Sequence, residues 1–437
     1  MKKLKPFLFV AMIGVLFITI FILWLQHDES LNDTTNELFA FQQGYQPDLK
    51  EHPYFIALGL DAKQDIDPML LGRLRYHQYW AHYFTAPLSE SDAQNSLELN
   101  IAQKFKGSGI DGHSKELLSN LSKNRDKGID LELLAKSKQQ LNLGFEKNQY
   151  LVQRYLNLIH QKNYRDLSLP ANSALLDYSN MMNIHYLYIS KLAMDRDADV
   201  LKSYIDQLIL IYADTTSLIY KMLLNRMIDS SLTLLHFLVD DVDSHMSVMP
   251  MTDQQLSYRK VFAGELWFIT TGLPSYENHI KNTSSHEEVI DNSSAIGLIG
   301  KSNLFFLPNM TINQFARQYQ PYIELSESPY LKFKAEVNLI GKQEQDQQQL
   351  FKLKNYIGNI LVNIGSPSFV DYIVRSRLLD HKIRVFNVLH GGKEWDLEQL
   401  NLNKDGYAFY QTQHELCIRS PYLKKIDWNQ DSCLAIQ

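Results

Sequence analysis

The chain has 437 residues, a net charge of −6 at neutral pH, 45% hydrophobic residues and 11% aromatic residues. This composition provides enough apolar material for a large core, so we exclude a chain that is mostly disordered. Nucleic-acid binding requires a basic stripe that neutralises phosphates, and neither the negative net charge nor the distribution of lysine and arginine supplies one. We therefore expect a folded protein that binds no nucleic acid.

The first predicted element is an apolar helix at residues 7–26, which contain no charged side chain. A helix of that length covers about 30 Å, the thickness of a bilayer's hydrocarbon core. The run ends at Trp24 and Leu25, without the small residues that a signal peptidase requires. We therefore predict an uncleaved transmembrane anchor.

The charges beside this run predict its orientation. Lys2, Lys3 and Lys5 precede it, and acidic residues follow it. By the positive-inside rule, the amino terminus then lies in the cytoplasm and the bulk of the chain in the periplasm. No other uncharged stretch of the sequence is long enough to span, so we predict a single-pass protein of the inner membrane.

Hydrophobic periodicity predicts that most of the remaining chain is helical. Within 132–162, apolar residues recur at three- and four-residue spacing, as on the buried face of a helix. A helix at 253–270 is expected to end near Gly272 and Pro274, before a loop or lobe boundary at 275–298. The same pattern predicts further helices at 172–194, 198–212, 215–240, 311–320, 346–363 and 366–381.

The last part of the chain has β character. Short alternation of apolar and polar residues flanks Asp405 and Gly406, a dipeptide typical of a hairpin turn. Cys417 and Cys433 are the only cysteines of the chain. We predict that they form a disulfide, because the predicted topology places them in an oxidising compartment. Two separate buried thiols are the alternative.

Together these patterns predict a mainly α fold class, with an amino-terminal transmembrane helix, a large multi-helix periplasmic domain and a small β-rich carboxyl-terminal cap. The predicted organisation is a cytoplasmic stub at 1–6, an anchor at 7–26, a linker at 27–50, a helical ectodomain at 51–383 and the cap at 384–437.

The segment 52–73, HPYFIALGLDAKQDIDPMLLGR, has the composition of an active-site loop. A catalytic role for Asp61, Asp65 or Asp67 would require a partner base or a metal that the local sequence does not supply. We interpret the segment as structural, with Asp67 and the following Pro68 starting a helix.

A second acidic run resembles the start of a calcium loop. Asp195, Asp197 and Asp199 alternate along the chain, but Val200 holds the position that requires glycine, and Asp206 replaces the bidentate glutamate. We interpret this run as a capping connection between two helices.

The densest group of ligand-type side chains is Asp240, Asp241, Asp243 and His245. Carboxylates with one imidazole can bind a divalent ion, yet no second histidine follows at helical spacing. We interpret this group as a solvated helix end and predict no metal.

Two further features have structural interpretations. The segment 107–115, with Ser108, Asp111 and His113, matches neither a phosphate loop nor a nucleophile elbow, and we expect a flexible loop. A set of tyrosines in the central helices is expected at the edge of the core, a partner-binding face being the alternative. These are Tyr178, Tyr186, Tyr188, Tyr204, Tyr212 and Tyr220.

Three segments together carry a resemblance: PYFIALGLDAKQDIDPMLLGR after the apolar run, NYIGNILVNIGSPSFVDYIVRSRLLD, and GKEWDLEQLNL near the carboxyl end. They resemble uncharacterised single-pass envelope proteins of Gram-negative bacteria. The resemblance implies a location in the envelope and implies no activity, cofactor or site residue.

The sequence contains no complete catalytic motif, which favours a non-enzymatic binding or scaffold protein with a protein partner in the envelope, and it indicates no cofactor. One alternative is an envelope hydrolase, for which Asp240, Asp243, His245, Ser108 and His113 would be the first residues to mutate. The other is an immunity protein against a toxin delivered to the periplasm. The sequence by itself does not decide between them.

Overall fold

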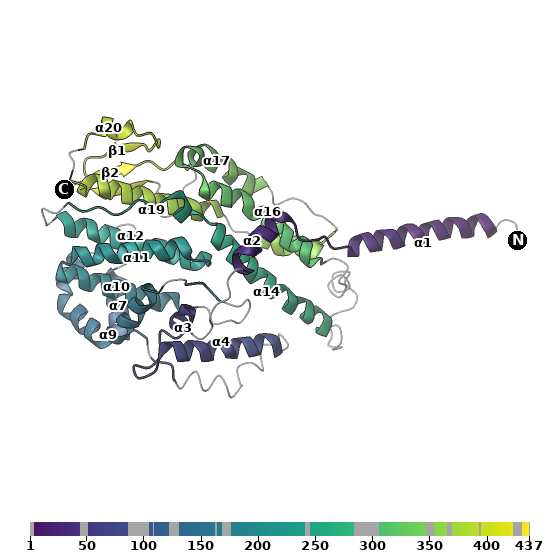
Figure 1. The fold of residues 1–437 in the computed structure, drawn as a ribbon, viewed down its shortest axis with the longest axis horizontal. Coiled ribbons are helices and arrows are strands. Elements are labelled where there is room, and N and C mark those ends of the chain that lie inside the picture. Colours follow the sequence, from purple (N-terminus) through teal and green to yellow (C-terminus); the bar gives the residue numbers. More distant parts are fainter. Residues whose placement is uncertain are drawn as a thin grey trace.

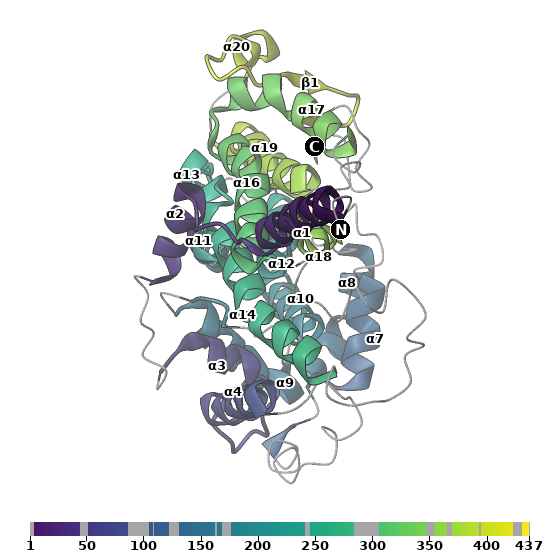
Figure 2. The ribbon, with the colours of Figure 1, turned by 90° about the vertical axis from the view of Figure 1, so that its right-hand side faces the viewer.

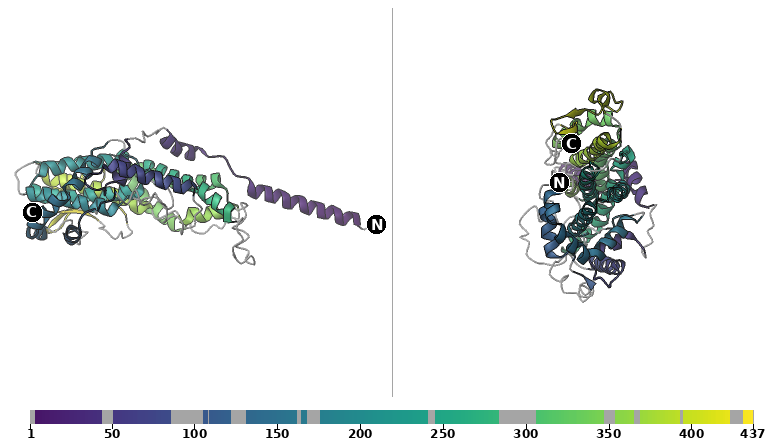
Figure 3. Two further views of the ribbon diagram at one scale, coloured as in Figure 1. Left: turned by 90° about the horizontal axis from the view of Figure 1, so that it is seen from below. Right: turned by 90° about the vertical axis from the view of Figure 1, so that its left-hand side faces the viewer.

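A computed structural model of the chain shows an elongated helical body from which one helix projects (Figures 1 and 3). The structure describes residues 4–43, 51–85, 105–107, 109–121, 131–161, 164–167, 176–240, 245–283, 306–346, 354–364, 369–392, 395–422 and 431–436.

The described chain is mainly helical, and its first half contains these helices: α1 (Leu4–Gln26), α2 (Asp33–Gln43), α3 (Pro53–Leu58), α4 (Pro68–Thr85), α7 (Gly112–Leu121), α8 (Leu131–Lys136), α9 (Lys138–Ile159), α10 (Tyr178–Asp195) and α11 (Ala198–Asp214). The second half contains α12 (Leu218–Asp240), α13 (Asp253–Leu256), α14 (Arg259–Thr283), α16 (Pro308–Glu327), α17 (Tyr330–Asp346), α18 (Tyr356–Ile364), α19 (Phe369–His390) and α20 (Leu397–Asn401). Three short strands follow: β1 (Phe409–Gln411), β2 (Glu415–Ile418) and β3 (Ser432–Ala435).

Helix α12 lies at the centre of the body. It packs against α10 and α11 on one side and against α19 on the other, and α9 lies beyond α10 (Figure 2). Five of its apolar side chains are excluded from solvent: Leu224, Met227, Ile228, Leu232 and Leu235 are each 0% exposed. These layers form one continuous core, as the amphipathic periodicity of the central helices predicted.

The segment that resembles an active-site loop builds a close helix pair instead. All side chains of α3 are buried, and α4 begins at Pro68 with the Asp67 carboxylate accepting from the backbone N–H of Met69 at 2.9 Å. The two helices approach so closely that a Cβ on Gly72 would lie 1.9 Å from the carbonyl oxygen of Phe55. Glycine is therefore required at this contact, and the predicted helix start at Asp67 and Pro68 is confirmed.

The carboxyl-terminal strands form one antiparallel sheet in the order β1-β2-β3. Cys417 of β2 faces Cys433 of β3, and the two sulfurs form a disulfide, as predicted. At the outer edge of β1, the Asn401 side chain accepts from the N–H of Phe409 at 2.8 Å and donates to its carbonyl at 2.9 Å. This amide occupies edge positions that a further strand would otherwise use.

Several predicted boundaries differ from the structure. The helix predicted to end near Gly272 and Pro274 extends to Thr283 as α14, because one interior proline costs a hydrogen bond without ending a helix that is otherwise supported. The predicted loop at 275–298 is helical as far as 283, and its remainder lies outside the described residues.

The predicted hairpin turn at Asp405 and Gly406 is wrong, because α20 precedes this dipeptide and the strands meet across the turn at 412–414. Helix α19 continues to His390, past the start of the predicted cap.

The described residues contain no helix that is both long enough and apolar enough to cross a membrane. This finding contradicts the predicted transmembrane helix at 7–26. It also contradicts the predicted single-pass location in the inner membrane with a periplasmic domain, which depended on that helix.

Candidate functional site: the projecting helix and its strap

The acidic residues singled out from the sequence serve the fold. Asp61 forms an ion pair with Arg75 at 2.5 Å. Asp197 accepts from the backbone N–H of Val200 and caps α11, and Asp195 pairs with Lys191 at 2.6 Å. The interpretation of this second run as a connection between helices is confirmed.

The residues of the hydrolase hypothesis are only partly described. Ser108, Asp241 and Asp243, and the side chain of Asp240, lie outside the residues that the structure describes. His245 is exposed, and its ring lies against Gly392.

The flexible loop predicted at 107–115 is wrong for residues 112–115, which form the start of α7. His113 is exposed in the first turn of α7, and Asp111 caps this helix by accepting from the backbone N–H of Ser114 at 3.1 Å. Hydrogen bonds from Ser114 and Asn148 lower the pKa of Asp111 to about 2, against the opposing effect of burial.

The described residues hold one group of three side chains with the geometry of a metal site, Glu415 with Cys417 and Cys433. The two cysteine sulfurs are bonded to each other, so neither is a thiolate that could bind an ion.

A buried polar network joins α9, α10, α11 and α12. The hydroxyls of Tyr155 and Tyr204 lie 2.6 Å apart, and His185 contacts Tyr204 through Nδ1 at 2.8 Å and Ser230 through Nε2 at 3.0 Å. Burial lowers the pKa of His185 to about 3. His185 and Ser230 are both 0% exposed, so a substrate could not reach them without opening the core, and we assign this network to the fold.

A second buried group surrounds Lys221 of α12. Its ammonium donates to the carbonyls of Tyr212 and Ser257, each at 3.1 Å, and lies 4.1 Å from the Tyr212 ring centroid. Burial, with a smaller contribution from the charge of Lys260, lowers the pKa of Lys221 to about 7. The carbonyls compensate for the loss of water, which identifies a structural lysine.

The tyrosines of the central helices are mostly core residues. Tyr204, Tyr212 and Tyr220 are at most 4% exposed, whereas Tyr178 and Tyr188 are partly exposed. The expectation of a core-edge position therefore holds for part of the set, and the rest lie deeper than predicted.

Helix α1 differs from every other described helix in its exposure. Figures 1 and 3 show it extending away from the body. Its exposed large apolar side chains are 37% to 68% accessible and comprise Met12, Ile13, Val15, Leu16, Phe17, Ile18, Ile20, Phe21, Ile22, Leu23 and Trp24. Because successive residues are turned by about 100°, these side chains surround the helix on all sides.

The end of α1 nearest the body is fixed. Leu25 is only 4% exposed, and the Lys354 ammonium lies 5.2 Å from the Trp24 ring centroid. The base of α1 therefore contacts the body through Trp24 and Leu25, while Gln26 beside them is exposed.

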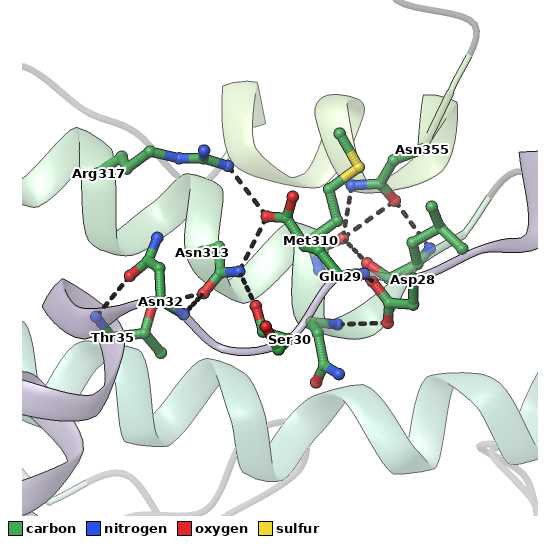
Figure 4. Close-up of polar contacts among 12 residues, drawn as sticks. Asp28, Glu29, Ser30, Asn32, Thr35, Met310, Asn313, Arg317 and Asn355 are labelled. Carbon is green, nitrogen blue, oxygen red and sulfur yellow. Dashed lines mark hydrogen bonds and ion pairs between the residues drawn. The ribbon is translucent and has the colours of Figure 1, made fainter. Parts of the chain in front are cut away.

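The residues that follow α1 form a strap, defined here as 28–35, which lies along α16. The carboxylate of Asp28 accepts from the backbone N–H groups of Asn309 at 2.8 Å and Met310 at 2.9 Å (Figure 4). The residue at the start of α16, Leu307, provides no side-chain cap. Asp28 therefore satisfies the first turn of α16 and places a negative charge at the positive end of its dipole.

The centre of the strap contact is Asn313, which is 1% exposed. Its Oδ1 accepts from the N–H of Asn32 at 3.0 Å and from the hydroxyl of Thr35 at 2.8 Å. Its Nδ2 donates to the Glu29 carboxylate and to the Ser30 carbonyl, each at 2.8 Å (Figure 4). All of these bonds join the strap to α16.

Ion pairs extend the contact on both sides of this amide. Arg317 of α16 lies 3.2 Å from Glu29. Farther along, Arg259 of α14 pairs with Glu37 of α2 at 2.5 Å and with Glu327 of α16 at 2.8 Å. The acidic residues after the apolar run, which served as topology signals in the sequence, are therefore fold contacts.

Comparison of the chain with protein-family models, with curated proteins and with solved structures finds no match. The resemblance to envelope proteins therefore stays a prediction.

Sequence reasoning missed Asn313 and Asp28 because their partners lie more than 270 residues away along the chain. A local signal existed only for α16, where Pro308 marks the first turn of a helix without a capping residue before it.

Proposed function

We propose that this protein is a non-enzymatic binding protein and that α1 is the element that binds its partner. The observation that carries the proposal is the exposure of large apolar side chains all around α1, on a helix whose base is fixed to the body. Burying one such side chain contributes roughly 1.5–3 kcal/mol, so a partner that covers α1 would gain much of its binding free energy there.

The distribution of these side chains around α1 favours a partner whose surface can enclose the helix. Leu16, Phe17 and Ile18 are consecutive and exposed, so they point in three different directions. A flat surface would cover only one of them. The partner that fits is a protein with a deep apolar groove, or a group of helices that receives α1 as an additional member.

Photo-crosslinking tests the proposal. A photoreactive residue at Phe17 should capture a protein that the same group at exposed Met249 of the body does not capture. The captured protein is then purified and titrated against the full chain. The variant Phe17→Asp should weaken binding at least tenfold, because a carboxylate in an apolar groove loses its hydration. Met249→Asp is the matched control and should bind normally.

Two outcomes would overturn the proposal. One is equal binding by Phe17→Asp and by the unmodified chain. The other is association of the full chain with protein-free phosphatidylcholine vesicles, lost in Phe17→Asp, together with no α1-specific capture of protein.

A further inference from the structure

We infer that the strap at 28–35 is a positioning device, which holds α1 in one direction relative to the body, and that Asn313 is its central positioning residue. The inference deepens the proposed function, since it concerns how the binding helix is presented, but it is tested without any partner.

The first step concerns the length of the connection. Helix α1 ends at Gln26 and α2 begins at Asp33, so a short connection separates the projecting helix from the first helix packed on the body. A connection of this length without contacts would act as a hinge, and α1 would sample many directions. The contacts between the strap and α16 determine whether this connection acts as a hinge.

The second step concerns the hydrogen bonds of the Asn313 side-chain amide. A side-chain amide has two N–H donors and one carbonyl oxygen that can accept two bonds. Asn313 uses both donors and both acceptor positions, and all of its partners belong to the strap. Since this amide is buried, any displacement of the strap would leave polar groups without partners away from water.

The third step is the pair of contacts that come before the partners of this amide along the chain. Asp28 replaces the missing cap of α16, and Leu25 is buried at the end of α1. Polar contacts therefore hold the strap from Asp28 to Thr35, and apolar burial holds the helix end before it. Because the last turn of α1 is buried at Leu25 and the following residues are bonded to α16, α1 cannot change its direction freely.

Pulsed EPR measures this directly. Both native cysteines are in the disulfide, so spin labels can be placed at two introduced cysteines, Phe17→Cys on α1 and Leu210→Cys on α11, both exposed positions. The full chain should give one narrow distance distribution. Adding Asn313→Ala should widen the distribution at least twofold, because the strap loses its central partner.

The controls separate positioning from folding. Gln320→Ala removes a residue of the same helix whose side chain bonds to exposed Glu324, and it should leave the distribution unchanged. Asp28→Ala changes only the strap side of the contact and should also widen the distribution, which keeps the test valid if Asn313→Ala fails to fold. Hydrogen exchange of α12 should be unaffected in the folded variants.

A broad distribution in the unmodified chain would overturn the inference, as would a narrow one in both Asn313→Ala and Asp28→Ala. These outcomes are independent of the proposed function, because α1 could bind a partner whether or not the strap fixes its direction.

Discussion

Helices α1 and α12 have the same length, 23 residues, and opposite environments. Apart from Lys5, α1 contains no charged residue, yet its large apolar side chains from Met12 to Trp24 are exposed. Helix α12 contains Lys221, Arg226 and Asp229, yet it lies at the centre of the body. Apolar composition therefore does not by itself determine which helix is buried.

The two helices differ in the hydrogen-bonding and ion-pair partners that neighbouring elements provide. Several polar residues of α12 meet partners from another element, with Lys382 pairing with Asp229 at 2.6 Å and His390 lying 2.7 Å from His236. A polar group can be buried without large cost when it is hydrogen-bonded. Among its described side chains, α1 contacts the body at its base, where Leu25 is buried and the Lys354 ammonium lies over the Trp24 ring.

The largest expected effect comes from truncating one apolar side chain in each helix. Leu235 of α12 is 0% exposed, and Leu16 of α1 is 59% exposed. Leu235→Ala should lower the free energy of unfolding by about 2–5 kcal/mol, because it leaves a cavity in the core. Leu16→Ala should change it by less than about 0.5 kcal/mol. Urea denaturation measures both, and similar losses would show that α1 is buried in solution.

The disulfide between Cys417 and Cys433 provides a third case, in which a covalent bond stabilises the structure in addition to burial and hydrogen bonding. Cys417→Ser should destabilise the sheet by on the order of 3 kcal/mol in the chain-entropy model. Hydrogen exchange should accelerate in β1 to β3 while α12 keeps its protection. Because α19 continues to His390, the loosened region should begin after that residue and not at 384. Acceleration throughout α12 would contradict this local effect.

A smaller effect is expected from a buried polar contact between α10 and α12. His185→Phe leaves the Tyr204 and Ser230 hydroxyls without one partner each and should cost about 1–3 kcal/mol. In α1, the exposed Thr19 hydroxyl donates to the carbonyl of Val15 at 2.8 Å, and Thr19→Val should cost less than about 0.5 kcal/mol. Chemical denaturation at pH 7 compares the two variants, and equal costs would remove the distinction.

The last effect is a pH dependence at the start of α12, where the backbone N–H of Leu218 donates to Glu265 at 3.1 Å. Burial, with a smaller contribution from the charge of Asp166, raises the pKa of Glu265 to about 7 from 4.5. The folded protein therefore binds a proton that the unfolded chain has lost, and stability falls as pH rises from about 4.5 to about 7. The slope from this group cannot exceed about 1.4 kcal/mol per pH unit.

Comparing the unmodified chain with Glu265→Gln isolates this contribution. The denaturation midpoint of the variant should depend less on pH across the same window. If the denaturation midpoints of the two proteins changed in parallel with pH, Glu265 would have the same pKa in the folded and the unfolded chain.

The sequence by itself determined the features that depend on local chemistry. The spacing of apolar residues predicted helices at 198–212 and 215–240, where α11 and α12 lie. The aspartate and proline at 67 and 68 predicted the start of α4, since a side-chain cap and a fixed φ act within one turn. The disulfide was predicted correctly, from the count of two cysteines together with a membrane topology that the structure contradicts.

Only the tertiary structure decided which apolar helix is covered and what the acidic residues after α1 do. Asp28 and Asn313 acquire their roles from contacts between segments more than 270 residues apart, which no local period records. In the sequence, an acidic residue next to an apolar run looks the same whether it marks membrane topology or caps a distant helix. The physical reason is that burial and hydrogen bonding depend on the groups brought together in space, whereas sequence patterns report only neighbours along the chain.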